Sequence, residues 1–191
     1  MIADRSSRTA EGAMFIRTLQ QQLPASERIL HDPWVAHLAL LSQRWIARIP
    51  FLARYFLRKF PRMVDYVPTR DRFGDEIIDD AVRTGTRQVV ILGAGLDTIS
   101  YRVLQRHPEC VLFEVDHPAT QVVKKRRARS LAAQFGHAIR YVAADFEVDD
   151  FRDNLAESGF QPDQPSVVIW MGVIYYLTEG AVTQTLSRAR D

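Results

Sequence analysis

The chain has 191 residues, of which 47% are hydrophobic, and its formal net charge at pH 7 is +2. This length and apolar content argue against disorder and fit one domain, or one domain with an appendage, around a buried core. The small charge predicts no general attraction to nucleic acid or membranes. The single cysteine, Cys110, excludes an intrachain disulfide and a cysteine-clustered zinc site. No segment resembles a signal peptide or reaches the length of a membrane span, so we expect a soluble, cytoplasmic protein.

Residues 1–83 are predicted to form an N-terminal helical domain. From Thr9 to Arg83 the apolar residues recur at helical spacing, with one predicted face formed by Leu38, Leu41, Trp45 and Ile49. Prolines lack the amide that a continuous helix needs, so we expect them to divide the region into short helices. They are Pro24, Pro33, Pro50, Pro61 and Pro68.

Residues 84–191 change to short β-rich runs separated by stretches long enough for one helix each. The predicted strands are Val89–Leu92, Val111–Val115, Ile139–Val142 and Val167–Trp170, and a last helix is expected from Thr178–Glu179 onward. Such alternation predicts an α/β fold with parallel strands and right-handed crossovers. Ligands of such sheets bind beyond the carboxyl ends of the strands.

A glycine pair follows the first predicted strand, at Gly93 and Gly95. Glycine allows the backbone to turn sharply and to approach a bound nucleoside, and Asp116, about twenty residues later, has the spacing of a ribose-binding carboxylate. The third glycine of the dinucleotide fingerprint is replaced by Thr98, which disfavours a pyrophosphate ligand. The pattern therefore favours S-adenosylmethionine over NAD.

Several motifs together resemble the leucine carboxyl methyltransferase-like family of S-adenosylmethionine-dependent methyltransferases, including its bacterial branch of O-methyltransferases. The segments that carry the resemblance are Ser7–Gly12, His31–Pro33, Arg70–Phe73, Gly93–Thr98, Phe113–Pro118, Ala144–Phe146, Gly172–Val173 and Tyr176–Thr178. The resemblance implies a Rossmann-like class I methyltransferase sheet, of which the first four parallel strands are present, with an N-terminal helical cap.

The resemblance also implies a cofactor site. Arg70 would hold the carboxylate of the methionine part, Asp116 the ribose hydroxyls and Asp145 the adenine amine, while Gly93 and Gly95 would shape the loop. These pairings agree with the hydrogen-bonding chemistry of each group. The full predicted set is Arg70, Gly93, Ala94, Gly95, Asp97, Asp116, Asp145 and Phe146. The alternatives are a surface arginine pairing with Asp71 or Asp75 for Arg70, and caps of turns or helices for Asp97 and Asp145.

Two departures from the family pattern stand out. Met171 occupies a position where many relatives carry glutamate, and the chain stops after the fourth strand and its helix, whereas this fold usually continues to about seven strands. We therefore expect a fragment, a truncated reading frame or one half of a larger assembly, with an unpaired strand edge that would favour self-association or pairing with another chain.

Other patterns favour structural roles. Lys124–Arg129 is expected to be a solvated helix face, and nucleic-acid binding is not expected. The aromatic and basic stretch from Trp45 to Phe60 suggests either a helix lying on a membrane surface or, as the resemblance implies, a cap that buries its aromatics over the cofactor rim. The histidines have no metal-ligand spacing, so no metal is expected. His31, Tyr175 and Tyr176 are conceivable bases, and no catalytic base is assigned.

The predicted function is S-adenosylmethionine-dependent O-methylation of a carboxylate or hydroxyl on a small molecule. The alternatives are a catalytically incomplete remnant that binds a cofactor or partner and, less favoured, an NAD-dependent oxidoreductase.

Overall fold

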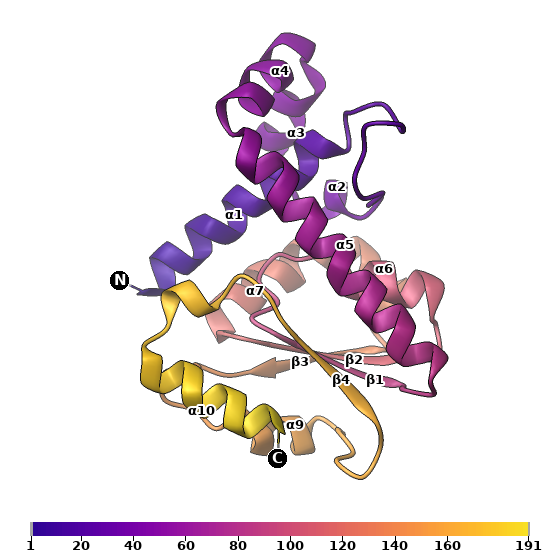
Figure 1. Cartoon of the computed structure of the whole chain (residues 1–191), viewed down its shortest axis with the longest axis vertical. Helices are drawn as coiled ribbons and strands as arrows, with labels where there is room; N and C mark the ends of the chain where they lie inside the picture. The colour runs from indigo at the N-terminus through magenta and orange to yellow at the C-terminus, as the bar shows by residue number, and fades with distance from the viewer. Residues whose placement is uncertain (1, 191) are drawn as a thin grey trace.

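The computed structural model describes the backbone of residues 2–190 and the side chains of residues 9–190. The side chains of Ser7 and Arg8 in the first family segment therefore lie outside the described part. So do the first residue of the predicted helical domain and the last residue of the predicted α/β domain. A parallel sheet lies between two layers of helices, and further helices extend from one end (Figure 1). The strands are β1 (Gln88–Leu92), β2 (Val111–Asp116), β3 (Ile139–Ala143) and β4 (Ser166–Trp170). The α-helices are α1 (Ile2–Gln20), α2 (Val35–Leu38), α3 (Leu41–Arg48), α4 (Pro50–Lys59), α5 (Pro61–Arg83), α6 (Ile99–Arg106), α7 (Pro118–Arg127), α8 (Ala132–Phe135), α9 (Phe151–Glu157) and α10 (Glu179–Arg190). Two short 3₁₀ helices, η1 (Ala128–Leu131) and η2 (Ile174–Tyr176), complete the set.

The sheet confirms the predicted α/β class, with all four strands within one residue of their predicted bounds. The strand order is β3-β2-β1-β4, and every neighbouring pair is parallel. Because the chain leaves β1 toward β2 and later returns to the other side of β1, the order reverses between β1 and β4. Such a reversal opens a crevice at the carboxyl ends of the two strands, which is where this class of sheet binds ligands.

The core lies on both faces of the sheet. Val89 and Ile91 of β1 pack with the layer that contains α5 and α6, whereas Val90 and Leu92 pack with α9. Successive side chains of a strand point to opposite faces, and both faces are covered. This explains why the β1 sequence is a continuous apolar run rather than an alternating one.

The prolines of the helical region behave in two ways. Pro50 and Pro61 stand at the first position of α4 and α5, where the missing amide has no helical partner. The expectation that Pro68 also ends a helix is wrong, because Pro68 lies buried inside α5. A proline there leaves the carbonyl four residues earlier without its donor. The side-chain amide of Gln20 on α1 donates to that carbonyl, Val64 O, at 3.1 Å, and so replaces the missing bond.

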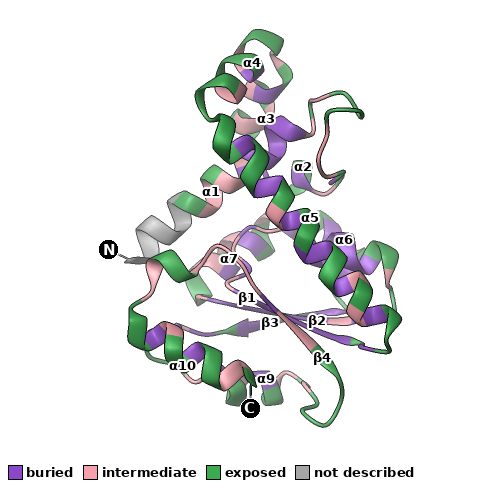
Figure 2. Cartoon of the chain, viewed as in Figure 1, coloured by how far each residue is buried: buried purple, intermediate pink, exposed green. Residues whose placement is uncertain are grey.

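The predicted apolar face from Leu38 to Ile49 is also wrong. It spans two helices, since α2 ends at Leu38 and α3 begins at Leu41, and the Trp45 side chain is 70% exposed. Helices α3 and α4 extend away from the sheet (Figure 1), and their outer surface is largely exposed (Figure 2). The aromatics of this segment therefore do not close over the rim of the sheet.

The basic run on α7 differs in part from its predicted solvated face. Lys125 and Arg126 are exposed, but Lys124 is buried and its Nζ lies 2.7 Å from the Glu114 carboxylate, which is equally buried. A buried charge needs such a partner, so Lys124 belongs to the interior of the protein. Among residues 2–190, no helix has the length and apolar character needed to cross a membrane.

Candidate functional site

The strand register brings the predicted site residues together. Leu92 of β1 is paired with Val115 of β2 and with Trp170 of β4. The residues that follow these three therefore lie side by side at the carboxyl ends of the strands, and they are Gly93, Asp116, which is the last residue of β2, and Met171. A pocket of about 280 Å³ lies at this edge, close to the lower end of the range for small-molecule sites. All eight predicted residues line it: Arg70, Gly93, Ala94, Gly95, Asp97, Asp116, Asp145 and Phe146.

The loop after β1 depends on two glycines with positive φ, +68° at Gly93 and +50° at Gly95. The Gly93 amide donates to Val115 O at 2.8 Å and continues the pairing with β2 beyond the strand. A Cβ on Gly93 would overlap the side chain of Val173, whereas a Cβ on Gly95 would lie 3.7 Å from Ala10 Cβ, an ordinary contact distance. The floor of the pocket is thus bare backbone at both positions.

We expect the two glycines to respond differently to alanine. Gly93→Ala should lower the free energy of unfolding by about 2–4 kcal/mol, because it adds a clash to the left-handed backbone, and Gly95→Ala by about 1–2 kcal/mol, because only the backbone term applies. Urea unfolding measures both values. Gly180→Ala, in a helix with open space around it, is the control and should not destabilise the chain. Equal losses at the two loop positions would contradict this account.

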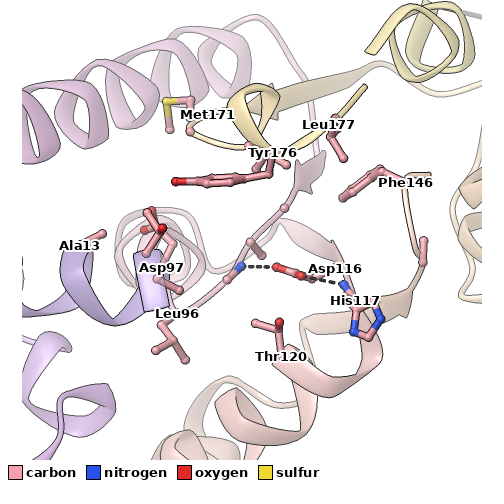
Figure 3. Close-up of a pocket in the computed structure, with 18 of the residues that line it drawn as sticks. Ala13, Leu96, Asp97, Asp116, His117, Thr120, Phe146, Met171, Tyr176 and Leu177 are labelled. Carbon is pink, nitrogen blue, oxygen red and sulfur yellow. Dashed lines mark hydrogen bonds between the residues drawn. The ribbon is translucent and has the colours of Figure 1, made fainter. Parts of the chain in front are cut away.

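Asp116 organises the end of β2. One carboxylate oxygen accepts from the Gly95 amide and the other accepts from the His117 amide at 2.6 Å, as Figure 3 shows. Burial raises the pKa of Asp116 above its ordinary value, and the two amide hydrogen bonds act in the opposite direction. A carboxylate accepts about four hydrogen bonds. The Asp116 carboxylate therefore keeps acceptor capacity for two further donors in the pocket.

Arg70 reaches the pocket from α5. Its Nη2 donates to Asp71 Oδ1 at 3.1 Å, and its guanidinium lies 5.8 Å from the Tyr66 ring centre. Its Nη1 passes so close to Gly172 that a Cβ there would collide with it, and Gly172 has a φ of +75°. The pairing with Asp71 that was the alternative for Arg70 is present, but the side chain is only 18% exposed and lines the pocket, so Arg70 is not a surface arginine.

Arg17 of α1 is a pocket residue that the sequence analysis missed. Its Nε donates to Asp71 at 2.6 Å and its Nη2 donates both to Asp71, at 3.0 Å, and to Asp97. Burial would raise the pKa of Asp97, but Arg17 and Arg102 outweigh it and hold that pKa well below the ordinary value. Arg17 therefore ties α1, α5 and the glycine loop together. A signal was present, since this arginine is the one charged residue in the otherwise mostly apolar segment Met14–Leu19.

Asp97 and Thr98 are the two residues immediately before α6, and both side chains form hydrogen bonds at the start of the helix. Asp97 Oδ1 accepts from the Ile99 amide at 2.9 Å, so the capping alternative for Asp97 holds alongside its place in the pocket wall. Thr98 is fully buried: its hydroxyl donates to Asp32 and accepts from Arg102 at 2.8 Å. Thr98, which occupies the position of the missing third glycine, is thus part of a buried polar network beneath α6.

Asp145 and Phe146 come shortly after β3, the strand next to β2, which ends at Asp116. Asp145 Oδ1 accepts from the Glu147 amide at 3.1 Å, which is the turn-capping role considered for it, and Asp145 also lines the pocket. The Phe146 ring lies 6.5 Å from that of Trp170. Figure 3 shows Phe146 and Leu177 along the same wall, with Tyr176 and Met171 above the glycine loop.

The remaining wall includes residues that carried no predicted role. These are Thr9, Ala10 and Ala13 of α1, Leu96, His117, Thr120, Ala144, Glu147, Val173 and Leu177. Most are small or apolar, and their positions depend on how α1 and the segment after β4 pack, which local sequence does not reveal. Of the conceivable bases, Tyr176 lines the pocket, whereas His31 and Tyr175 do not. Within the described residues, no group of acids, histidines or cysteines has the arrangement of a metal site.

Comparisons with known proteins identify the family. Residues 10–190 match the family model described as leucine carboxyl methyltransferase. The chain is 38% identical over 115 residues to a protein of Mycobacterium bovis BCG named "Putative S-adenosyl-L-methionine-dependent methyltransferase", covering 60% of this chain and 32% of that one. A protein of Mycolicibacterium smegmatis with a similar name is 38% identical over 125 residues, covering 65% of this chain and 41% of its own.

The solved structures that match include the S-adenosylmethionine-dependent methyltransferase SibL in its apo form, with a TM-score of 0.46 and 16% identity over 94% of this chain and 46% of that one. The chain spans about a third to two fifths of the length of the curated relatives described above. The family model matches nearly every residue of the chain, and the chain therefore belongs to the leucine carboxyl methyltransferase family.

Proposed function

We propose that residues 84–191 form the S-adenosylmethionine-binding unit of a methyltransferase and that residues 1–83 form its helical cap. The acceptor in this proposal is a carboxylate or hydroxyl oxygen of a small molecule. The observation that carries the proposal is the convergence of the Gly93–Gly95 loop, Asp116 and Arg70 on one pocket, in a chain that belongs to this family.

The chemistry of the pocket residues fits this cofactor. Asp116 has acceptor capacity for a ribose diol, and the glycine backbone leaves room for a nucleoside beside it. Arg70 has N–H groups beyond those used by Asp71, and a guanidinium suits the carboxylate of an amino acid. Asp145 offers its second oxygen to the adenine amine, and the Phe146 ring provides an apolar wall. The Ala94 backbone completes the loop, and Asp97 acts mainly by holding it in place.

The start of α6 favours a nucleoside without phosphates over NAD. The amides at a helix N-terminus usually bind the pyrophosphate of a dinucleotide. Here Asp97 already accepts from the Ile99 amide and places a negative charge at that point. A pyrophosphate would have to displace or face this carboxylate, which Arg17 holds ionised. This repulsion supports the methyltransferase proposal over the oxidoreductase.

When bound, the cofactor supplies a methyl group already activated by its sulfonium. The protein then has to bind both partners, align the acceptor oxygen and exclude water, and such positioning accounts for much of the rate in reactions of this kind. A carboxylate acceptor needs no general base near neutral pH. The absence of an assigned base is compatible with that acceptor. A hydroxyl acceptor would require a base within hydrogen-bond reach, for which Tyr176 is the candidate on the pocket wall.

Isothermal titration calorimetry of the 191-residue chain tests the proposal. We expect binding of S-adenosylmethionine and S-adenosylhomocysteine, and no binding of NAD at the same concentrations. Binding of NAD alone would overturn the proposal. A parallel assay for S-adenosylhomocysteine formation with small carboxylic acids separates an active enzyme from a unit that only binds the cofactor.

We further propose that β4 offers a pairing edge. Within the described residues β4 bonds only to β1, and it is one of the two edge strands of the sheet, β3 being the other. Its free amides and carbonyls could pair with another strand, from a longer form of the chain or from a second copy. Light scattering across a concentration series tests the second case, for which we expect a mass that increases with concentration.

A further inference from the structure

The outer face of α4 combines cations and aromatic rings that the core does not use. Its inner face packs into the helical core through Ala53 and Phe56, and the Phe56 ring lies 5.0 Å from that of Phe15 on α1. The outer face presents Phe51, 68% exposed, and Tyr55, 54% exposed. These rings line an open hollow together with Arg54, Arg58 and Lys59. An outward face of this composition is not required for the fold.

Charge is distributed unevenly along the chain. Residues 33–64 contain six basic residues and no Asp or Glu, although the whole chain has 23 acids against 25 Lys and Arg. The six are Arg44, Arg48, Arg54, Arg58, Lys59 and Arg62. Within the described side chains none of them forms an ion pair with a carboxylate, in contrast to Arg17, Arg70 and Arg102 near the pocket. We call this cluster, with Leu41, Trp45, Phe51 and Tyr55, the α3–α4 patch.

We propose that the α3–α4 patch docks on an anionic phospholipid surface. Unpaired cations are attracted to anionic headgroups, and exposed aromatic and aliphatic side chains insert at the boundary with the acyl chains. The Leu41 side chain is 71% exposed and would contribute nothing to binding a polyanion such as RNA, so its presence favours a lipid surface. The patch also lies on helices that extend away from the sheet (Figure 1), and all 23 acids of the chain lie outside residues 33–64.

The geometry connects this surface to the pocket. α5 begins at Pro61, directly after α4, and carries Arg62 of the patch as well as Arg70 of the pocket. The two arginines are eight positions apart on the helix, a rise of about 12 Å along the axis. Docking of the patch would therefore hold the pocket a short and fixed distance from the lipid surface.

Vesicle sedimentation of the 191-residue chain tests this proposal. We expect binding to phosphatidylcholine vesicles that contain phosphatidylserine, weak binding to phosphatidylcholine alone, and loss of binding at high salt. The double variant Arg54→Glu/Arg58→Glu should lower the partition coefficient by about tenfold or more. Phe51→Ser/Tyr55→Ser should lower it with no change in charge. Thermal unfolding verifies that both variants keep the fold, because all four side chains are exposed.

Arg126→Glu/Arg129→Glu is the matched control, since both arginines are exposed and lie outside the patch. It makes the same change in net charge and should retain most of the binding. The proposal is overturned by equal binding to neutral vesicles, by full binding of Arg54→Glu/Arg58→Glu, or by an equal loss in the control. It is also overturned if the wild type does not bind vesicles at all. In that case, loss of self-association or of RNA binding in the patch variants would show that the patch contacts a second copy or RNA instead of lipid.

Discussion

Replacing Arg17 with methionine is expected to lower the free energy of unfolding by about 3 kcal/mol, near the low end for breaking a buried ion pair. Methionine has a similar length but no charge, so Asp71 and Asp97 lose a shared partner inside the protein. Partial compensation remains, because Asp71 keeps Arg70 at 3.1 Å. A loss of this size is a large fraction of the 5–15 kcal/mol that stabilises a typical domain. Urea unfolding measures it.

Two further variants sharpen the Arg17 prediction. Arg72→Met breaks an exposed pair with Glu76 on α5 and should cost no more than about 0.5 kcal/mol. Adding Asp97→Asn to Arg17→Met removes a carboxylate that has lost its nearest partner and keeps Arg102 at 3.8 Å, so it should restore part of the stability. If Arg17→Met were no more harmful than Arg72→Met, the ion pairs of Arg17 would contribute nothing to the fold.

Replacing Asp116 with alanine is expected to weaken the binding of S-adenosylmethionine by about a hundredfold, which corresponds to losing two hydrogen bonds to a charged group. The prediction rests on the proposed function. The Gly95 amide would also lose its acceptor, so the glycine loop would be less well held. Calorimetric titration gives the affinity. Asp150→Ala is the control, because Asp150 accepts a similar backbone bond at the start of α9 but does not line the pocket.

A ligand variant separates direct contact from loop damage. The wild-type chain should bind S-adenosylhomocysteine more tightly than its 2′-deoxy analogue, because Asp116 accepts from the ribose hydroxyls. In Asp116→Ala this preference should disappear. If the variant still preferred the ribose form as strongly as the wild type does, another residue would hold the diol.

The sheet and the pocket were largely predictable because their residues carry local signals. Strands buried on both faces are continuous apolar runs, and β1 and β2 have that character. Gly93 and Gly95 could be identified in the sequence because the turn after β1 needs glycine. The parallel register then brings Asp116 and the loop together without further information.

The helical region was less predictable because its outcome depends on distant partners. The apolar spacing around Trp45 resembles a buried face, yet that side chain is 70% exposed. The network of Arg17 joins residues that are 54 and 80 positions apart, which periodicity does not detect. Asp145 combines a turn cap with a place on the pocket wall, so the two interpretations of that residue were not exclusive.

Because α5 contains Pro68, its backbone hydrogen bonding is completed by a side chain of α1. The Gln20 amide that completes the hydrogen bonding of Val64 comes from a helix made earlier in synthesis, and Gln20 is almost fully buried in the interface. Without that donor α5 would be free to bend at Pro68, two residues before Arg70. The hydrogen bond from Gln20 therefore supports the course of α5 just before Arg70, and a nascent chain can form this bond only once α1 and α5 have packed together.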